Sequence, residues 1–457
     1  MRKKAIIEKI ASAPATALEY GIEEAEKFEK ELISKKPVQA AEVYWKNLGP
    51  GLTTGAADDD PSGIATYSQT GAKFGYQLLW LAPITFPLMA VIQEMCSRVS
   101  MITGRGLARN IKLRYPAWVL YSTTAMLFFA NSFNIGANLG IMAKATQLLF
   151  PGVGFVFLLI TFSLTSVLLQ IFTAYARYAR FLKYLALVLF FYAFSALSMN
   201  LDWRSVFKSI IAPSITFSRD QLYLICAIFG TTISPYLFFW QSSQEVEEEI
   251  LEGRRTVRER QKNNTDADIK KMRIDVWSGM LISNAAMFFI IVACAGALFK
   301  NGLTDVGSAE QAALALRPFA GELAFFFFSA GIIGTGLLSI PVLAGSASYA
   351  LSEAFGWKNG LYRKLKDAKA FYGIIIISMI LGLLVNSLGI DPIKTLVFSA
   401  VLNGLIAPII LYLIVSIARD KKIMGRFKNS RLSSMLGWTT ILIMSLAGIA
   451  VVGGFFM

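Results

Sequence analysis

The amino-acid sequence predicts an all-α protein that crosses a membrane about eleven times. Two observations indicate this class. Of the 457 residues, 55% are hydrophobic and 16% are charged, whereas a soluble domain carries about 25% charged residues. Apolar runs of roughly 20 residues also recur along the chain, and a helix of that length crosses about 30 Å of hydrocarbon. A large soluble core would not produce so many such runs.

The spans follow a charged N-terminal segment, residues 1–46, which has no apolar core or cleavage site typical of a signal peptide. We expect this segment to be a cytoplasmic, soluble arm that contains an amphipathic helix. The expected spans are 49–68, 76–98, 117–142, 154–173, 183–199, 221–243, 276–299, 321–350, 370–388, 393–416 and 435–456.

The basic residues predict the orientation of the chain. If the N-terminus is cytoplasmic, 36 of the 44 Lys and Arg residues fall in the inner segments, as the positive-inside rule requires. With eleven spans, the C-terminus is then outside the cell. Topology therefore explains the net charge of +14. We expect a multi-pass protein of the cell membrane with no nucleic-acid partner, and the sequence indicates no oligomeric state.

Residue types that the chain lacks exclude several kinds of chemistry. It has no histidine, which removes imidazole metal ligands and histidine proton relays. Its three cysteines, Cys96, Cys226 and Cys294, lie in or beside spans without metal-like spacing. No phosphate-binding loop of the GxxxxGK type is present, and Glu94 is the one candidate partner for an intramembrane aspartyl hydrolase. We therefore do not expect an enzyme.

Span 1 contains an unusually polar stretch, TTGAADDDPSG (53–63). Proline can begin a helix at Pro61, but the residues before it cannot keep regular helical hydrogen bonds. Freed backbone groups and charges occur inside a membrane where they line a polar cavity. The carboxylates of Asp58, Asp59 and Asp60 therefore predict a cavity that holds a cation. Asp58 and Asp59 are equally suited to a structural role, and the sequence leaves that choice open.

Span 6 contains a second interruption, FGTTISPYLFFW (229–240). Five spans separate it from the first, and two broken helices in corresponding positions are typical of inverted-repeat secondary transporters with a site near the bilayer midplane. Two ordinary proline kinks are the alternative. We expect repeats at 47–200 and 201–418, a solvated cytoplasmic helix and loop at 244–275, and an eleventh span within 419–457.

At these breaks the chain resembles the NRAMP family of divalent-metal transporters, which share the inverted-repeat architecture of the bacterial leucine transporter. GPGLTTGAADDDPSG (49–63) is similar to the family's first-span pattern GPG…DPGN, and GTTISPYLFFWQSS (230–243) to its sixth-span pattern ATVMPHNLYLHS. LMAVIQEMCSRVSMITGRGLA (88–108) and KKIMGRFKNSR (421–431) resemble its TGRDLA segment and the loop before span 11. The resemblance runs from Gly49 to about Leu436.

The resemblance implies a set of metal ligands. The aspartate of DPGN matches Asp60, and the asparagine ligand matches Gly63, which would leave a larger cavity. The family's backbone carbonyl ligand in span 6 matches Thr231, and its methionine ligand matches Ser234. We therefore expect Asp60, Thr231 and Ser234 to hold the metal, with Asp59 and Gly63 also in the substrate site.

Further matches imply residues along the pathway or around the site. The family's two span 6 histidines match Tyr236 and Gln241, and its two span 3 acids match Asn131 and Asn134. We therefore expect these four residues, together with Asp58, to line the pathway or surround the site. A glutamine ligand of span 10 matches Ala400. Taken together, the replacements in this chain remove sulfur, imidazole and titratable groups from the family's site and pathway.

These replacements favour a hard cation. Thioether sulfur prefers softer transition metals, whereas oxygen-only sites suit Mg²⁺ and Ca²⁺. Mg²⁺ often keeps several waters and binds through one or two carboxylates. The chain is similar in this respect to NRAMP-related magnesium transporters, which also lack the methionine. We therefore expect Mg²⁺, with Mn²⁺ as the second candidate, and no cofactor apart from the transported ion.

Proton coupling is not expected, because asparagine cannot change charge and the usual titratable chain is missing. Asp58, Asp59 and Glu94 are the acids that could carry protons by another route. A divalent ion that crosses 100 mV gains about 4.6 kcal/mol, enough for accumulation without protons. The alternative function is a transporter of a small organic solute or anion on the same fold, with metal transport lost. Asp60 favours a cation, whereas a free helix N-terminus after Pro61 or Pro235 would favour a carboxylate.

Overall fold

A computed structural model describes residues 49–173, 190–214, 216, 218–262 and 264–454, and in these residues the regular structure is helical throughout. The described residues from Pro50 onward form one unit. The predicted N-terminal arm and the first part of the expected span 183–199 lie outside the described residues. The second half of that span contains α10 (Phe190–Ser198).

Eight segments within the described residues are long and apolar enough to cross a membrane, and each overlaps an expected span. They are Ala117–Leu149, Phe155–Phe172, Arg219–Leu251, Asp266–Asn301, Ala309–Phe355, Lys369–Leu388, Pro392–Arg419 and Arg431–Gly454. The predicted all-helical membrane fold is confirmed.

Most of the helices have the following bounds, and the remaining ones are given where they first appear: α5 (Leu81–Thr103), α6 (Leu107–Arg114), α7 (Ala117–Leu149), α8 (Phe155–Phe172), α11 (Trp203–Ile211), α16 (Ala309–Ala313), α17 (Arg317–Ala320), α18 (Ala324–Phe355), α19 (Lys369–Val385), α20 (Pro392–Arg419), α21 (Lys421–Met424) and α22 (Arg431–Gly454). Short 3-10 turns are Phe299–Asn301, Leu314–Leu316, Gly321–Leu323, Leu365–Asp367, Asn386–Leu388 and Gly425–Phe427.

The first span is broken where the sequence predicts it. Helix α3 (Pro50–Asp58) ends before Asp59, and α4 begins at Pro61 and ends at Phe74. Asp60 has an extended backbone and caps α4, because its side chain accepts a hydrogen bond from the Gly63 amide. Proline at the first helical position loses no intrahelical bond. The chain therefore restarts as a helix directly after the three aspartates.

The sixth span is broken in the same way. Helix α12 (Arg219–Thr232) and α13 (Pro235–Leu251) are separated by Ile233 and the extended Ser234. Both predicted interruptions are therefore confirmed, each with a proline at the start of the second half-helix.

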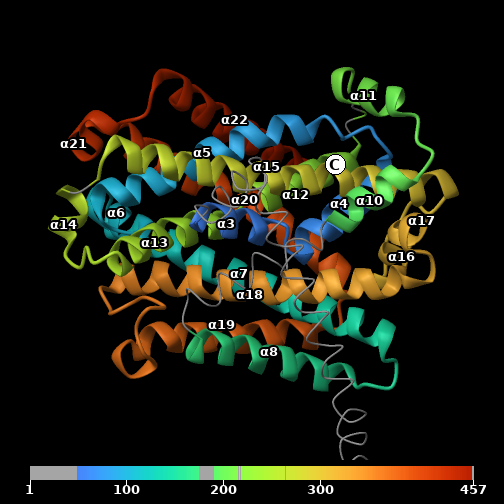
Figure 1. Ribbon diagram of the computed structural model, residues 1–457, viewed down its shortest axis with the longest axis horizontal. Coiled ribbons are helices and arrows are strands. Elements are labelled where there is room, and N and C mark those ends of the chain that lie inside the picture. The colour runs from blue at the N-terminus through green and yellow to red at the C-terminus, as the bar shows by residue number, and fades with distance from the viewer. Residues whose placement is uncertain (1–48, 174–189, 215, 217, 263, 455–457) are drawn as a thin grey trace, which may run out of the picture. The chain divides into compact units, whose positions relative to one another are not determined.

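The two broken helices lie in the interior of the helix assembly. In Figure 1, α3 and α4 lie between α15 (Asp266–Ala297) on one side and α7 with α18 on the other, and α3 and α4 pack against α15. Helices α8 and α19 lie at one margin (Figure 1) and expose apolar side chains, among them Leu164, Leu168, Ile377 and Ile380. Exposed apolar residues of this kind suit contact with lipid tails.

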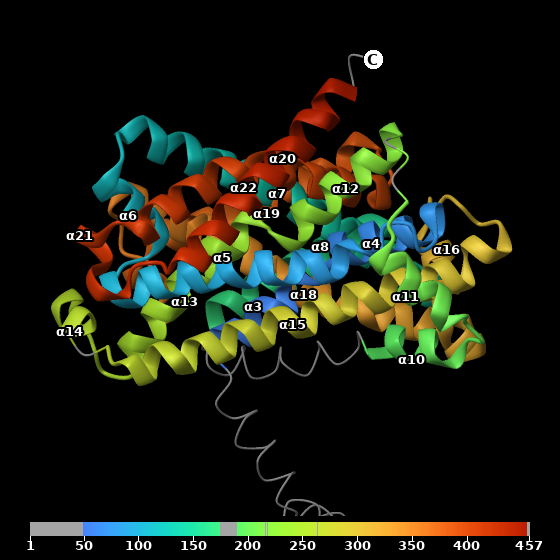
Figure 2. The ribbon, with the colours of Figure 1, turned by 90° about the horizontal axis from the view of Figure 1, so that it is seen from above.

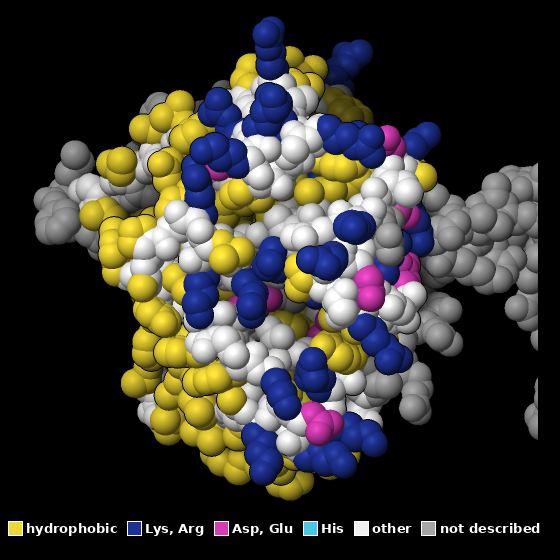
Figure 3. Space-filling model, turned by 90° about the vertical axis from the view of Figure 1, so that its left-hand side faces the viewer, with side chains coloured by type: hydrophobic (Ala, Val, Ile, Leu, Met, Phe, Trp, Pro, Cys, Tyr) yellow, Lys and Arg dark blue, Asp and Glu magenta, His cyan; other side chains and the backbone are white. Residues whose placement is uncertain are grey.

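Basic residues gather at one end of the unit, which we call the basic end. It contains α6, α14 (Val257–Lys262), α21 and the connection after α18. Figure 2 shows the same elements together in a second view, and Figure 3 shows the dark blue Lys and Arg side chains spread across this face. The basic segments that the structure describes thus share one side, as the positive-inside rule predicts. That this side is cytoplasmic stays a prediction.

The expectation of a solvated helix and loop at 244–275 is wrong in part. Helix α13 continues to Leu251, and α15 already begins at Asp266. Glu245, Glu247 and Glu249 are each no more than 6% exposed. The alternating acids resemble a solvent-facing pattern, but helices α5, α6 and α18 pack against α13 and cover them.

Candidate cation site

The two helix breaks lie directly beside each other. The Tyr236 hydroxyl, at the start of α13, donates to the Ala57 carbonyl at the end of α3, 2.9 Å away. Ser62 of α4 and Thr231 of α12 place their hydroxyl oxygens 3.4 Å apart. The structure therefore brings Asp60, Thr231 and Tyr236 into one buried region, as the sequence predicts.

Asp60 is surrounded by protein hydrogen-bond donors. Its Oδ1 accepts from the Ser62 hydroxyl at 2.5 Å and from the Gly63 amide at 2.9 Å. Its Oδ2 accepts from the amide nitrogens of Asn134 at 3.2 Å and Asn138 at 3.3 Å. A carboxylate offers about four lone-pair positions. All four are therefore in use, so a cation would have to replace one of these donors.

The other two aspartates are much less satisfied. Asp58 Oδ2 accepts from the Ser283 hydroxyl of α15 at 2.6 Å, and its Oδ1 has no hydrogen-bond partner. Neither oxygen of Asp59 has one. Both side chains are fully buried. Buried oxygens of this kind are costly unless something positive satisfies them, so these three oxygens are the strongest indication of a ligand.

No Lys or Arg within the described residues forms an ion pair with any of the three aspartates. All three carboxyl groups are inaccessible to solvent. A group of three or more acidic or cysteine side chains arranged to hold one metal ion is also not found in the described part of the chain. The site therefore offers separate carboxylates that hydroxyls and amides supplement.

The Ser234 hydroxyl points back along α12 and donates to backbone carbonyls of that helix. It donates to the carbonyl oxygens of Gly230 at 2.7 Å and Thr231 at 2.8 Å. The hydroxyl proton thus covers two carbonyls at the C-terminal end of α12, among them the predicted carbonyl ligand. The oxygen of Ser234 retains its lone pairs for a cation.

The expectation that Gly63 enlarges the cavity is wrong at this position. A Cβ atom at Gly63 would lie 3.3 Å from the Thr231 hydroxyl oxygen, the Asp58 carbonyl oxygen and Cε2 of Tyr67. Neighbours from α3, α4 and α12 thus already occupy the space that a side chain would need. Gly63 lets these helices approach closely and leaves no extra room.

Two of the predicted pathway residues lie away from the aspartates. Asn131 donates to the Leu343 carbonyl at 2.9 Å and the Ser346 hydroxyl at 2.8 Å, so it links α7 to α18. Gln241 accepts from the Thr54 hydroxyl and donates to Glu245 at 2.8 Å. Gln241 therefore links the half-helices α3 and α13. Of the two predicted asparagines, Asn131 and Asn134, the structure places Asn134 against Asp60.

Sequence reasoning missed three residues of the site, Ser62, Asn138 and Ser283. Ser62 follows Asp60 by two residues, so its place beside the break could have identified it. Asn138 follows Asn134 by one helical turn, so both lie on one face of α7; this spacing could have identified it. Ser283 lies within an ordinary apolar run of α15, and no local pattern marks it.

A pocket of about 280 Å³ opens at the end of the unit opposite the basic end. Its lining includes Gln69 and Lys73 of α4, Asp220 and Asp305. Gln69 donates to Asp305 at 2.8 Å, and Lys73 pairs with Asp220 at 2.7 Å. These contacts join α4 to α12 and to the connection after α15. They lie on the side of the aspartates that faces away from the basic end.

The basic-end side of the site is closed by close packing of α3 on α15. Asp275 of α15 accepts hydrogen bonds from the amides of Gly51, at 2.6 Å, and Leu52, at 3.2 Å, which caps the start of α3. A Cβ atom at Gly279 would lie 2.7 Å from the Gly51 carbonyl carbon, and one at Gly55 2.8 Å from the Gly279 Cα. Glycines spaced four apart allow this backbone contact.

Residues 51–453 match the family model described as Natural resistance-associated macrophage protein-like (Nramp). The chain belongs to the Nramp family. It is 24% identical over 424 residues to the divalent metal cation transporter MntH of Yersinia enterocolitica, a match that covers 90% of this chain and 96% of the relative.

Solved structures place this Nramp chain in the expected fold. It matches a manganese transporter from Eremococcus coleocola, solved with an aromatic bis-isothiourea substituted compound, with a TM-score of 0.72 and 18% identity over 90% of this chain and 89% of that one. It also matches Mhp1, a nucleobase-cation-symport-1 family transporter with bromovinylhydantoin bound, with a TM-score of 0.51 and 14% identity over 89% and 91% of the two chains. Identities this low show the fold alone.

Proposed function

We propose that this Nramp protein is a secondary transporter that moves a hard divalent cation by alternating access, with Mg²⁺ favoured and Mn²⁺ as the second candidate. One observation carries the proposal: three buried carboxyl groups, with no basic partner in the described residues, lie where two broken helices meet. Charged groups at such depth are costly unless a positive charge compensates them. A divalent cation supplies that compensation.

The chemistry of the donors favours a hard ion. The groups around Asp60 are hydroxyls and amides of Ser62, Asn134 and Asn138, and the family's methionine position carries Ser234. Oxygen ligands without sulfur suit Mg²⁺ better than softer transition metals. The similarity to MntH of Yersinia enterocolitica, a divalent metal cation transporter by name, supports metal transport but leaves the ion open.

The asparagines offer a mechanism for binding. Each now directs an amide N–H at Asp60, and the Oδ1 of Asn138 has no hydrogen-bond partner. Rotation of the Asn138 amide by about a half turn would withdraw an N–H and present an oxygen, so carboxylate and amide could then face the cation together. The amide oxygen missing at Gly63 would thereby be supplied from α7.

The half-helix α3 is the element best placed to move. It is nine residues long, and its continuation is broken at Asp59 and Asp60. Its contacts with α15 close the basic-end side of the site, and the Gln69–Asp305 and Lys73–Asp220 contacts lie on the other side. Alternating access requires these two sets of contacts to open in turn.

Transport of an organic anion is disfavoured by the same observation. An anion would need a positive partner near the site, whereas the side chains described around Asp60 donate neutral hydrogen bonds. Two further carboxyl groups beside it would repel an anion.

The test is uptake by the purified protein in proteoliposomes, with Mg²⁺, Mn²⁺, Ca²⁺ and amino acids as separate substrates. We expect Mg²⁺ uptake that Asp60→Ala abolishes. Asp367→Ala, which removes an exposed carboxylate at the basic end, is the matched control and should transport normally. Amino-acid uptake without divalent-ion uptake, or equal Mg²⁺ uptake by Asp60→Ala, would refute the proposal.

A further inference from the structure

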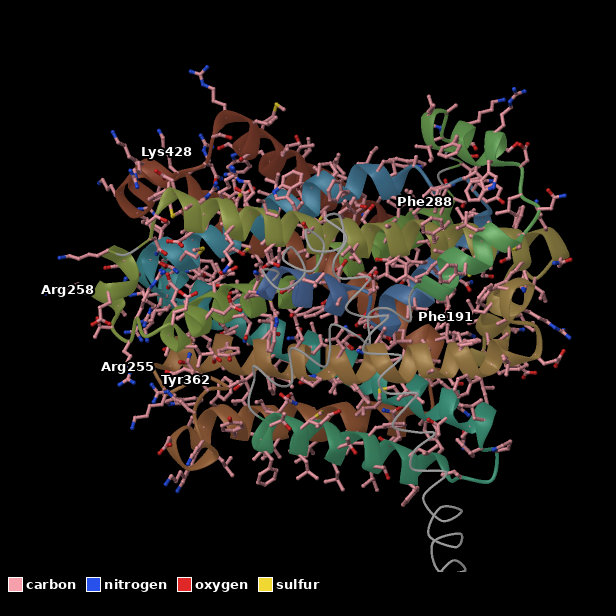
Figure 4. All side chains as sticks on the ribbon, viewed as in Figure 1. Phe191, Arg255, Arg258, Phe288, Tyr362 and Lys428 are labelled. Atoms are coloured by element: carbon pink, nitrogen blue, oxygen red, sulfur yellow. The ribbon has the colours of Figure 1, made fainter. Side chains whose placement is uncertain are left out.

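A second polar pocket, of about 250 Å³, lies at the basic end and away from the three aspartates. Five arginines line it, and we call it the arginine pocket. They are Arg105, Arg109, Arg255, Arg260 and Arg363. They come from the turn after α5, from α6, from the connection before α14, from α14 and from the connection after α18. Figure 4 labels Arg255 and Tyr362, which both line this pocket, at that end of the unit.

Most of this positive charge is not neutralised within the described part of the protein. No ion pair there involves Arg105, Arg109, Arg255 or Arg363. Two glutamates also line the pocket, but each accepts hydrogen bonds from other groups: Glu247 from the Tyr349 hydroxyl and the Leu361 amide, and Glu353 from the Arg109 amide. Glu353 and Glu247 also lie within electrostatic range of Arg109 and Arg363. The pocket therefore holds five arginines against two glutamates, which leaves an excess of positive charge.

The walls of the pocket are held in place independently of any ligand. Arg260 donates to the Gly104 carbonyl through Nε and Nη2, both at 3.1 Å, and to the carbonyls of Arg254 and Arg255 at 3.0 Å. Arg363 lies over the Tyr362 ring at 4.9 Å. These contacts join α14 to the turn after α5. Arg363 also donates to the Asn359 carbonyl at 3.0 Å, so protein atoms hold two of the five guanidinium groups in place.

Aromatic side chains beside the pocket indicate the depth of the membrane interface. Trp357, which lines the pocket, stacks on Phe355 at 4.8 Å, and Phe355 packs against Tyr121 at 5.2 Å. All three are between 41% and 50% exposed. Exposed Trp and Tyr residues at the end of membrane helices are typical of the level of the lipid head groups.

We propose that the arginine pocket binds the phosphate of an anionic phospholipid from the leaflet at the basic end. Arginine matches phosphate geometry with paired N–H groups, and basic pockets between membrane helices bind anionic head groups. The aromatic cluster places the pocket where such a head group lies. A soluble phosphate compound shares the recognition chemistry but would not need this aromatic neighbourhood.

A lipid bound here would join elements that are distant in the sequence. The pocket is lined by Ser243, Val246 and Ile250 of α13, by Arg109 of α6 and by Trp357 after α18. Helix α13 is the second half of a broken span, so a phosphate held against its end would stabilise the arrangement that the structure shows.

The experiment measures lipid retention and does not depend on transport. The full-length protein is purified from nanodiscs of phosphatidylcholine with phosphatidylglycerol, and bound lipid is counted by native mass spectrometry. We expect retention of phosphatidylglycerol by the wild type. The double variant Arg109→Gln/Arg255→Gln should bind it on the order of tenfold to thirtyfold more weakly. Arg258→Gln removes an exposed arginine of α14 that does not line the pocket (Figure 4) and should bind normally.

Three results would overturn the proposal. Equal loss of lipid in the double variant and in Arg258→Gln would show general surface attraction. Stabilisation of the detergent-purified protein by inorganic phosphate or glycerol phosphate, without phosphatidylglycerol retention, would assign the pocket to a soluble anion. Retention unchanged in the double variant would place the lipid elsewhere. Because Arg255 is exposed and forms no ion pair with the described residues, the single variant Arg255→Gln provides a folded test if the double variant is unstable.

Discussion

At the scale of single residues, the three adjacent aspartates have three different environments. Asp60 receives four hydrogen bonds, Asp58 receives one from Ser283, and Asp59 has no hydrogen-bond partner. The three aspartates, although identical in type and adjacent in the chain, therefore differ in how far the protein satisfies their carboxyl oxygens. These differences assign Asp60 a structural role in addition to binding, whereas Asp59 gains little from the protein alone.

The variants Asp59→Asn and Asp60→Asn should therefore change stability in opposite directions. Asp59→Asn removes a buried charge without partners and should raise the melting temperature in metal-free detergent solution. Asp60→Asn puts an amide N–H against existing donors and should cost about 1–3 kcal/mol of unfolding free energy. Thermal unfolding followed by circular dichroism measures both, and equal shifts would contradict this assignment.

Two asparagines on the same helix give a second contrast at this scale. Asn138→Ala removes a side chain that contacts Asp60, and we expect the KM for divalent-ion uptake to rise by about 10–100-fold, as for other residues that support a metal site. Asn131→Ala removes contacts to α18 only and should leave the KM unchanged. If Asn131→Ala raised the KM more than Asn138→Ala does, the result would contradict this assignment and would indicate that Asn131 belongs to the transport pathway.

At the scale of elements, the half-helix α3 and helix α15 form the contact on which closure of the basic-end side depends. Three glycines, Gly51, Gly55 and Gly279, bring the two backbones together, and Asp275 caps the first turn of α3. Since the break at Asp59 separates α3 from α4, we expect these contacts to contribute most to holding α3 against α15, together with the hydrogen bond from Ser283 to Asp58.

A methyl group at Gly279 should therefore displace α3. Gly279→Ala places a Cβ 2.7 Å from the Gly51 carbonyl carbon, so one backbone must move. The readout is labelling of a cysteine introduced at Ala56, which is 3% exposed in α3, by a thiol reagent in proteoliposomes. We expect faster labelling in Gly279→Ala.

The control for this prediction is Gly373→Ala in α19. A Cβ at Gly373 meets nothing within 4 Å, so the exchange adds the same methyl group without a clash. Labelling at position 56 should stay as slow as in the unmodified background. Equal labelling in both variants would show that the α3–α15 contact does not control closure.

At the scale of the whole molecule, charge is distributed in a way that a cation transporter can use. Positive side chains cover the basic end (Figure 3), whereas the aspartates lie buried at the broken helices. The chain has no histidine, and the two asparagines predicted to replace titratable acids cannot carry protons. We therefore expect the membrane potential to be the driving force, at about 2.3 kcal/mol per charge and 100 mV.

Divalent-ion uptake should consequently leave the internal pH unchanged. Proteoliposomes loaded with a pH-sensitive dye should show Mg²⁺ uptake that depends on the imposed voltage, with no acidification inside. The buried Glu245, which bonds to Gln241, is an alternative proton carrier outside the three aspartates. Acidification that Glu245→Gln abolishes would reject uncoupled transport and identify the route.

The sequence by itself determined the features that arise from local composition. Apolar length predicts membrane helices, proline after the aspartates and after Ser234 predicts both breaks, and the basic segments predict one positive end. Each of these follows from a short stretch of chain, because helix termination and partition into hydrocarbon depend on nearby residues.

Only the tertiary structure decided which partners meet across helices. It pairs Asp60 with Asn138, Asp58 with Ser283 and Asp275 with the start of α3. It also buries Glu245, Glu247 and Glu249, and assembles the arginine pocket from five separate segments. Local patterns cannot specify these contacts, because each joins residues brought together by packing between helices that are distant in the sequence.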